Sequence, residues 1–205
     1  HKIDIIPLLD KTSENVREMG ACNTLYRDGE KICGENTDVI GFTAPLRKRS
    51  LSPETRVLVL GAGGVSRAAI AGLRRLGLAN ITLTNRRKER AEALCNEFGL
   101  LCAPWEERGD VPADLIINTT PLGMTGAQEH ETPYPRAFQD NGIAYDLIYT
   151  PFQTRFLRDA AAAGWETVSG LDMFIGQGDA QFHLWTGHHL PEEAITAVTS
   201  ALYGQ

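Results

Sequence analysis

The sequence lacks the cysteine and histidine spacings that bind metals or build disulfide frameworks. No C-x-x-C pair occurs among its four cysteines, and no H-E-x-x-H occurs among its five histidines. These absences predict neither a metal site nor a disulfide-stapled fold. Reduced thiols are typical of proteins in the cytosol, so we expect a cytoplasmic location.

The sequence also lacks an excess of positive charge and a long apolar run. It has 20 Lys and Arg residues against 26 Asp and Glu residues, a formal net charge of −6. Binding to a nucleic-acid backbone needs a positive surface, so nucleic acid is not expected as a partner. No apolar run approaches the roughly 20 residues that cross a bilayer and no signal peptide is visible, so we expect no membrane partner either.

A glycine-rich turn follows directly after a short apolar stretch. Residues 56–60 lead into Gly61, Ala62, Gly63, Gly64 and Val65, and a helix-forming segment comes next. Gly61 can adopt backbone angles that a side chain forbids, and Gly63 lets the backbone approach phosphate oxygens. The free N–H groups at the helix start then bind the anion. This pattern predicts a dinucleotide site, while a turn that needs glycine for purely structural reasons is the alternative.

Apolar strands and helices alternate from residue 56 onwards. The pattern predicts strands over 57–60, 81–84, 101–103, 115–118, 143–146 and 166–168, and helices over 64–76, 88–98, 154–163 and 173–185. Such alternation is typical of an α/β fold with a doubly wound parallel (Rossmann) sheet, whose ligand lies at the carboxyl ends of the strands.

The first 50 residues and the last 18 follow a different pattern. We expect two short helices over 1–19, a hairpin turning at Asp28-Gly29, and a helix capped by Thr37 or Asp38 that runs to about Arg49. Pro191 opens a last helix. The predicted division is a smaller substrate domain over 1–40, with 188–205 folding back on it, and a nucleotide domain over 41–187; the stretch 47–53 is the candidate boundary.

The end of the second predicted strand indicates which dinucleotide is bound. An NAD site places an acidic residue there, whereas this chain has Asn85, Arg86, Arg87 and then Arg90. Guanidinium groups bind phosphate bidentately and stack on adenine, so Arg86 and Arg90 favour NADP. Surface arginines at the start of an amphipathic helix are the alternative. Cations oppose the dipole at a helix N-terminus, which makes a bound anion the better explanation.

Seven motifs in order resemble those of the shikimate dehydrogenase family. Without them, Lys2, Asn23 and Asp38 stand out only as polar residues, and Asp38 is equally a helix cap. The motifs are 20–24 (G-A-x-N-T), 34–38 (G-x-N-T-D), 61–68 (G-A-G-G-x-x-R-A), 85–90 (N-R-T-x-x-R), 118–124 (N-A/T-T-P-x-G-M), 146–157 (D-x-x-Y-x-P-x-x-T-x-x-L) and 170–177 (G-x-x-M-x-x-x-Q).

The resemblance implies NADP-dependent interconversion of 3-dehydroshikimate and shikimate, a step of aromatic amino-acid biosynthesis. It makes Lys2 and Asp38 the catalytic pair, and places Asn23, Gln177 and Tyr149 at the substrate. The cofactor contacts that it implies are Gly61, Ala62, Gly63, Gly64, Val65, Asn85, Arg86, Arg87, Arg90, Thr119, Met124 and Gly170. No metal is implied, and a homodimer is the candidate oligomer.

The chain departs from the family pattern at two places. The family has a further segment before His1 with a Ser-x-Ser that holds the substrate carboxylate, so we expect this chain to be a fragment that binds NADP but turns over substrate poorly. Arg87 stands where the family has Thr. The alternatives are a quinate/shikimate dehydrogenase that prefers NAD, a non-catalytic NADP-binding module, and a methylenetetrahydrofolate dehydrogenase, for which no folate-site pattern is seen.

Overall fold

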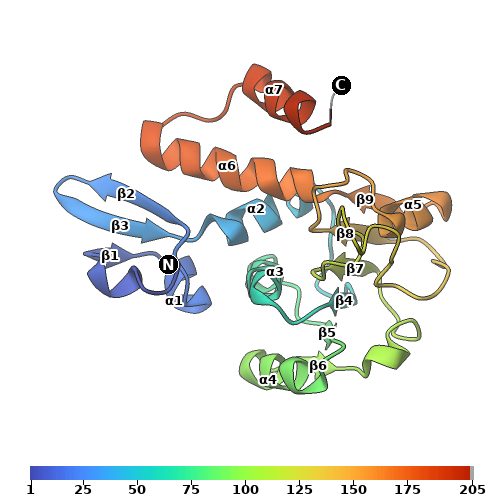
Figure 1. The fold of residues 1–205 in the computed structure, drawn as a ribbon. Helices are drawn as coiled ribbons and strands as arrows, with labels where there is room; N and C mark the ends of the chain where they lie inside the picture. Colours follow the sequence, from blue (N-terminus) through green and yellow to red (C-terminus); the bar gives the residue numbers. More distant parts are fainter. Residues whose placement is uncertain (204–205) are drawn as a thin grey trace.

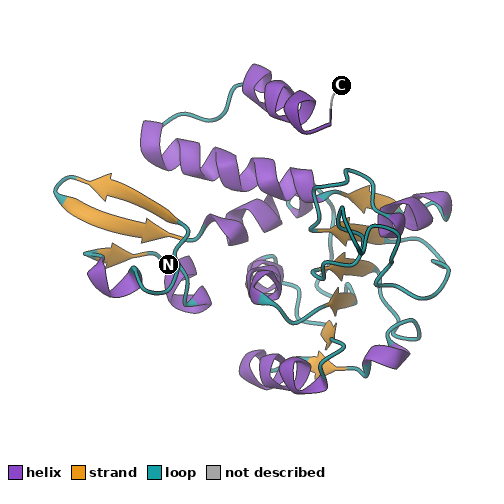
Figure 2. Cartoon of the chain, in the orientation of Figure 1, coloured by secondary structure: helices purple, strands orange, loops and turns teal. Residues whose placement is uncertain are grey.

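A six-stranded parallel sheet is the core of the larger part of the molecule in the computed structural model, which describes residues 1–203 (Figure 2). Its strand order is β6-β5-β4-β7-β8-β9, and every neighbouring pair is parallel. The strands are β4 (Val57–Leu60), β5 (Ile81–Thr84), β6 (Leu101–Cys102), β7 (Leu115–Asn118), β8 (Ile143–Asp146) and β9 (Glu166–Val168). The predicted α/β fold with a doubly wound parallel sheet is therefore confirmed.

Helices cover both faces of this sheet (Figure 1). Alternate side chains of β4 point to opposite faces, so Val57 and Val59 join one buried cluster and Leu58 and Leu60 join the other. The first cluster includes side chains from α2 (Thr37–Leu46), α3 (Gly64–Arg75), α4 (Lys88–Phe98) and α6 (Gly170–Thr186). The second includes α5 (Arg155–Ala162) and part of the long segment between β7 and β8.

A small three-stranded sheet lies beside the main one. The hairpin at Asp28-Gly29 is confirmed as β2 (Thr24–Asp28) and β3 (Lys31–Glu35). The prediction of two helices before it was incomplete. The turn η1 (Ile6–Leu8) and helix α1 (Glu14–Met19) are separated by β1 (Lys11–Thr12), which pairs in parallel with β3. A strand of two residues has no periodicity to read, and only its partner defines it.

Two helix starts differ from the sequence prediction. Neither Thr37 nor Asp38 caps α2; Asn36 does, because its side-chain oxygen accepts a hydrogen bond from the Asp38 N–H at 3.1 Å. The helix ends at Leu46 rather than near Arg49. Helix α6 begins at Gly170, before the predicted Met173, because Ser169 and Asp172 form a capping box.

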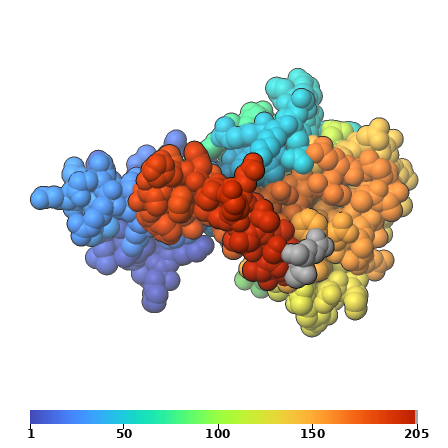
Figure 3. All heavy atoms as spheres, turned by 90° about the horizontal axis from the view of Figure 1, so that it is seen from above, coloured from blue at the N-terminus to red at the C-terminus, as the bar shows by residue number. Residues whose placement is uncertain are grey.

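Helix α6 connects the two sheets. It crosses α2 where Gly41 and Gly176 meet, and a Cβ at Gly41 would lie 2.5 Å from the Met173 carbonyl oxygen. At its far end Trp185 Nε1 donates to the Leu25 carbonyl of the hairpin at 2.8 Å. Seen from above, α6 and α7 (Glu192–Tyr203) lie across the middle of the molecule (Figure 3).

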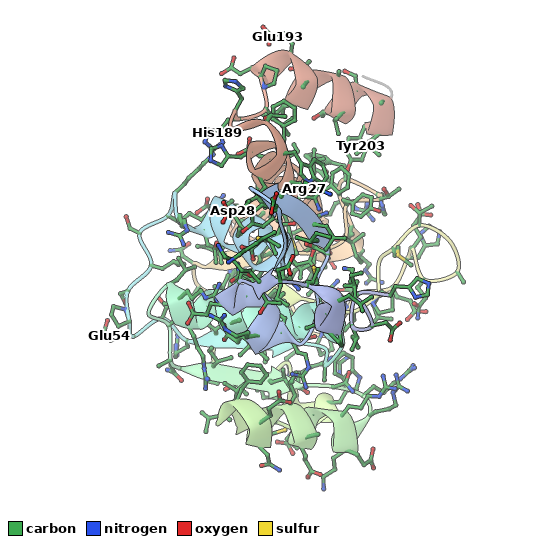
Figure 4. The ribbon with its side chains drawn as sticks, turned by 90° about the vertical axis from the view of Figure 1, so that its left-hand side faces the viewer. Arg27, Asp28, Glu54, His189, Glu193 and Tyr203 are labelled. Atoms are coloured by element: carbon green, nitrogen blue, oxygen red, sulfur yellow. The ribbon has the colours of Figure 1, made fainter. Side chains whose placement is uncertain are left out.

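Helix α7 packs near the loop that follows β8. The Tyr203 hydroxyl donates to the Tyr149 carbonyl, and the rings of Tyr203 and Phe152 lie 5.2 Å apart between centroids. Figure 4 shows Tyr203 at one end of this helix and His189 at the turn before it. Residues 204 and 205 of the predicted C-terminal segment lie outside the described residues. Within 1–203, no helix combines the length and the apolarity needed to cross a membrane.

Candidate active site

The glycine turn lies between β4 and α3 as predicted. Gly61 has a φ of 116°, and a Cβ there would lie 2.5 Å from Thr119 Oγ1, so this position requires glycine on both counts. The turn leaves the N–H groups of Gly64 and Val65 without an acceptor within residues 1–203. These are the first helical N–H groups, and such groups bind anions.

A chain of hydroxyl groups holds the turn against β7. The Gly63 N–H donates to Ser66 Oγ at 2.9 Å, and Thr119 Oγ1 donates to the Leu60 carbonyl at 2.8 Å. Ser66 therefore donates to Thr119 across the 2.7 Å between their oxygens. The Thr119 hydroxyl is thus occupied within the protein, and so is the Gly63 N–H.

Three arginines gather beside the turn at the start of α4. Arg86, Arg87 and Arg90 line a cavity of about 210 Å³, and the glycine turn and the residues after β7 form its other walls. Within the described chain, no carboxylate lies within ion-pair distance of any of the three. Uncompensated positive charge at a helix start fits an anionic ligand, because it otherwise opposes the helix dipole.

A second cavity, of about 560 Å³, opens on the other side of the glycine turn. Gly63 lines the first cavity and Gly64 the second. Seven of the predicted site residues line this second cavity: Lys2, Asp38, Gly64, Val65, Tyr149, Gly170 and Gln177. The structure therefore brings together residues that lie as far apart in the sequence as Lys2 and Gln177, from α2, α3, α6 and two loops.

Asp38 is the polar centre of the second cavity. Lys2 Nζ lies 3.4 Å from Asp38 Oδ2, and Asn23 Nδ2 donates to Asp38 Oδ1 at 2.9 Å. The Asp38 side chain is 22% exposed and that of Lys2 60% exposed, so the ammonium group reaches solvent while the carboxylate is largely enclosed. The Lys2 carbonyl accepts a hydrogen bond from the Cys22 N–H at 2.7 Å, which fixes the start of the chain beside Asn23.

Asn23 contacts both Asp38 and the start of α2. Its side-chain oxygen accepts a hydrogen bond from the Thr37 N–H at 2.9 Å, so the amide joins the start of β2 to the first turn of α2. An amide group has two N–H donors, and one remains after the bond to Asp38.

Gln177 and Tyr149 approach the cavity from the main sheet. Gln177 lies in α6 despite its glycine neighbours, and Tyr149 stacks on Phe174 of the same helix with ring centroids 5.1 Å apart. Gly170 starts α6 against the backbone of Ile148, where a Cβ would collide.

A buried carboxylate supports the loop that carries Tyr149. Asp146, at the end of β8, accepts hydrogen bonds from Thr154 Oγ1 at 2.6 Å, the Ile148 N–H at 3.0 Å and Asn118 Nδ2 at 3.0 Å. Burial raises the pKa of Asp146 to about 7, against the opposing effect of these three donors.

Several residues of the two cavities have no counterpart in the sequence prediction. Trp105 lines the first cavity, and Arg67 and Phe174 line the second. The predicted cofactor contact Met124 lines neither cavity and is 49% exposed. Across residues 1–203, no group of three or more His, Cys, Asp or Glu side chains is placed to hold a metal ion.

Comparisons with known proteins are consistent with this geometry. A family model described as Shikimate / quinate 5-dehydrogenase matches residues 46–107, and one described as Shikimate 5'-dehydrogenase C-terminal domain matches residues 170–198. The shikimate dehydrogenase (NADP(+)) of Pelobacter propionicus is 55% identical over 205 residues, which cover 98% of this chain and 74% of that protein.

Solved structures share the arrangement. The shikimate 5-dehydrogenase of Thermus thermophilus in complex with NADP(H) and shikimate is 36% identical, with a TM-score of 0.84 over 98% of this chain and 76% of that one. The quinate dehydrogenase of Corynebacterium glutamicum in complex with NAD is 28% identical, with a TM-score of 0.84 over 98% of this chain and 75% of that one.

Proposed function

Since the chain belongs to the shikimate dehydrogenase family, we propose that the first cavity binds the adenosine part of the cofactor and the second binds the substrate. The protein is an NADP-dependent oxidoreductase that interconverts 3-dehydroshikimate and shikimate in aromatic amino-acid biosynthesis. The observation that carries the proposal is the juxtaposition of unpaired arginines in one cavity with the Lys2 and Asp38 pair in the next.

The first cavity fits the adenosine end of NADP. Arg86, Arg87 and Arg90 supply donors for a 2′-phosphate, and an acidic residue that would repel this phosphate does not lie among the residues lining the cavity. Gly61 lets the turn pack closely against Thr119. The free N–H groups of Gly64 and Val65, which line the second cavity, suit the pyrophosphate that joins the two halves of the cofactor. Bound NADPH supplies the hydride.

In the second cavity Lys2 delivers the proton. Reduction of a ketone builds negative charge on the carbonyl oxygen, and an ammonium group stabilises that charge and protonates the oxygen. Asp38 holds the ammonium of Lys2 in place, while Asn23 fixes the orientation of the carboxylate. In the oxidative direction the same pair accepts the proton from the substrate hydroxyl.

Polar groups around the pair orient the ring of the substrate. The amide of Gln177 and the hydroxyl of Tyr149 line this cavity and suit the ring hydroxyls of shikimate. Asn23 lines neither cavity, and its remaining N–H would reach the substrate from beside Asp38. Fixing these hydroxyls places the carbon that receives the hydride near its donor. The proposed substrate domain is then 1–40 and the nucleotide domain is 41–187. Helix α7, predicted to fold back on the former, contacts Tyr149 and Phe152 of the latter.

Cofactor and substrate assays test the proposal. Reduction of 3-dehydroshikimate is followed by loss of NADPH absorbance, with NADH as the matched cofactor, and oxidation of shikimate is compared with oxidation of quinate. Turnover is measured on the 205-residue chain and on a chain of the relatives' full length. We expect preference for NADPH and for shikimate. Equal rates with NADH, or preference for quinate, would contradict it.

A further inference from the structure

Trp105 is the aromatic residue of the cofactor cavity. It begins the short turn η2 (Trp105–Glu107) after β6, and among the described residues lining the cavity its side chain alone has a π face. It also borders a neighbouring hollow together with Asn85 and Arg86, so the indole stands between the two spaces. The partly buried indole also packs against the second buried cluster, to which α5 contributes.

Arg108 fixes the indole in place. The guanidinium carbon lies 3.9 Å from the centroid of the Trp105 ring, at cation–π distance. Arg108 Nε donates to the Pro133 carbonyl at 2.6 Å, and Nη1 donates to the Trp105 carbonyl at 2.5 Å. One face of the indole is thus covered by an anchored cation, and the same side chain lines the cofactor cavity.

We propose that Trp105 is the stacking surface for the adenine ring of the cofactor. This inference rests on the proposed function and adds a base-binding residue to it. Arg86 lines the same cavity, and a planar guanidinium and an indole both stack on a purine. The arginines distinguish NADP from NAD by the 2′-phosphate, whereas Trp105 contacts a part that both cofactors share.

Binding of 2′,5′-ADP, which carries the adenine and the 2′-phosphate without the nicotinamide, tests the proposal. Truncation in Trp105→Ala raises its dissociation constant about tenfold, as expected for loss of a base–aromatic stack. The variant Trp105→Phe keeps a π face and stays within about threefold of wild type. The ratio of the dissociation constants for NADP⁺ and NAD⁺ does not change in either variant.

Tryptophan fluorescence provides the control. Binding of 2′,5′-ADP quenches emission in the wild type and in Trp185→Phe, whose indole lies at the hairpin, but not in Trp105→Phe. Quenching that persists in Trp105→Phe overturns the proposal, as does wild-type affinity in a Trp105→Ala protein with unchanged circular dichroism. A wild-type protein that does not bind 2′,5′-ADP overturns the proposed cofactor itself.

Discussion

The carboxylate of Asp38 receives donors from two distant parts of the chain. Lys2 approaches one oxygen and Asn23 the other, and the first turn of α2 carries the carboxylate between them. With the amide bound to Oδ1, the second oxygen faces the ammonium group. This arrangement orients a proton donor before the substrate binds.

The variants Lys2→Ala and Asp38→Asn test this pair. We expect kcat to fall about a hundredfold or more in each, the usual contribution of a positioned acid or base. The ion pair between Lys11 and Asp28 is the matched control, because its atoms are 2.7 Å apart and it lies outside both cavities. A loss of activity in Asp28→Asn as large as that in Asp38→Asn would contradict the assignment.

Asp146 predicts a pH dependence of stability. Its pKa is raised from 3.8 to about 7 in the folded state, so between these values the folded state binds one proton more than the unfolded state. The contribution of Asp146 to the free energy of unfolding is therefore complete below the unfolded pKa and is lost as the pH rises through the folded pKa. The loss is about 4 kcal/mol at most.

Urea unfolding of wild type and Asp146→Asn across this pH window measures the effect. The amide does not titrate, so the difference in unfolding free energy between the two proteins isolates Asp146 from the other carboxylates. We expect the advantage of the wild type to shrink as the pH rises towards neutrality. Growth of this advantage with pH would mean that the three hydrogen bonds outweigh burial.

At the scale of elements, the start of α4 carries an unfavourable charge pattern. Arg87 is its N-cap residue, and Lys88 and Arg90 lie in its first turn, where the helix dipole disfavours cations. Glu89 is the one acidic residue of this turn, and the excess of cations around it fits an anion bound there.

The variant Arg90→Gln separates binding from stability. We expect its dissociation constant for NADP⁺ to rise about tenfold while that for NAD⁺ stays unchanged, since a charge-assisted bond to the 2′-phosphate is lost. Lys88→Gln is the control, because Lys88 lies in the same turn and pairs with Glu92 at 3.5 Å. Calorimetric titration of both cofactors measures this, and equal weakening for NADP⁺ and NAD⁺ would contradict it.

The close crossing of α2 and α6 requires a residue without a side chain at Gly41. A Cβ there would lie 2.5 Å from the Met173 carbonyl and 2.8 Å from the Gln177 nitrogen, so Gly41→Ala must push α6 away. We expect unfolding free energy to fall by about 2 kcal/mol, as in an overpacked core, and kcat to fall because Gln177 moves.

Gly178→Ala is the matched substitution in the same helix. The nearest atom to its added Cβ would be Leu190 Cδ1 at 4.0 Å, so the change removes only the helical cost of glycine. It is expected to stabilise the protein by about 0.5–1 kcal/mol with unchanged kcat. Thermal unfolding and steady-state kinetics of both variants measure these effects. Unchanged stability and kcat in Gly41→Ala would show that the crossing tolerates a Cβ.

At the scale of the whole molecule, the main sheet could be predicted almost to the residue. Buried parallel strands are short continuous apolar runs, and 57–60, 81–84 and 115–118 are such runs between glycine-rich or polar turns. The small sheet was harder. The strand β1 exists only through its pairing with β3, and 36–38 offers three adjacent capping residues among which packing chooses Asn36.

The candidate site could be predicted where motifs carry it. Lys2, Asp38 and Gln177 do meet in one cavity, although nothing in their spacing alone places position 2 beside position 177. Trp105 had no motif, since a single tryptophan in a polar loop is compatible with many roles, and its position depends on Arg108 and the loop at Pro133. The role of Met124 stays a prediction.

Cofactor binding is expected to stabilise the molecule as a whole. A ligand bound only by the folded state at a hundredfold excess over its dissociation constant adds about 2.7 kcal/mol. NADP⁺ should therefore raise the thermal unfolding midpoint more than NAD⁺ at equal concentration, and Arg90→Gln should reduce the difference. Differential scanning fluorimetry measures the shifts, and equal shifts in the wild type would contradict the selectivity.

The three unpaired arginines lie in a protein whose formal net charge is −6. At physiological ionic strength the charges of a protein are screened over about 8 Å, so an anionic cofactor in bulk solvent meets little repulsion. Close to the cavity, the guanidinium groups that line it act on the cofactor most strongly. The chain can therefore stay acidic overall and still capture a polyanion at one spot on its surface.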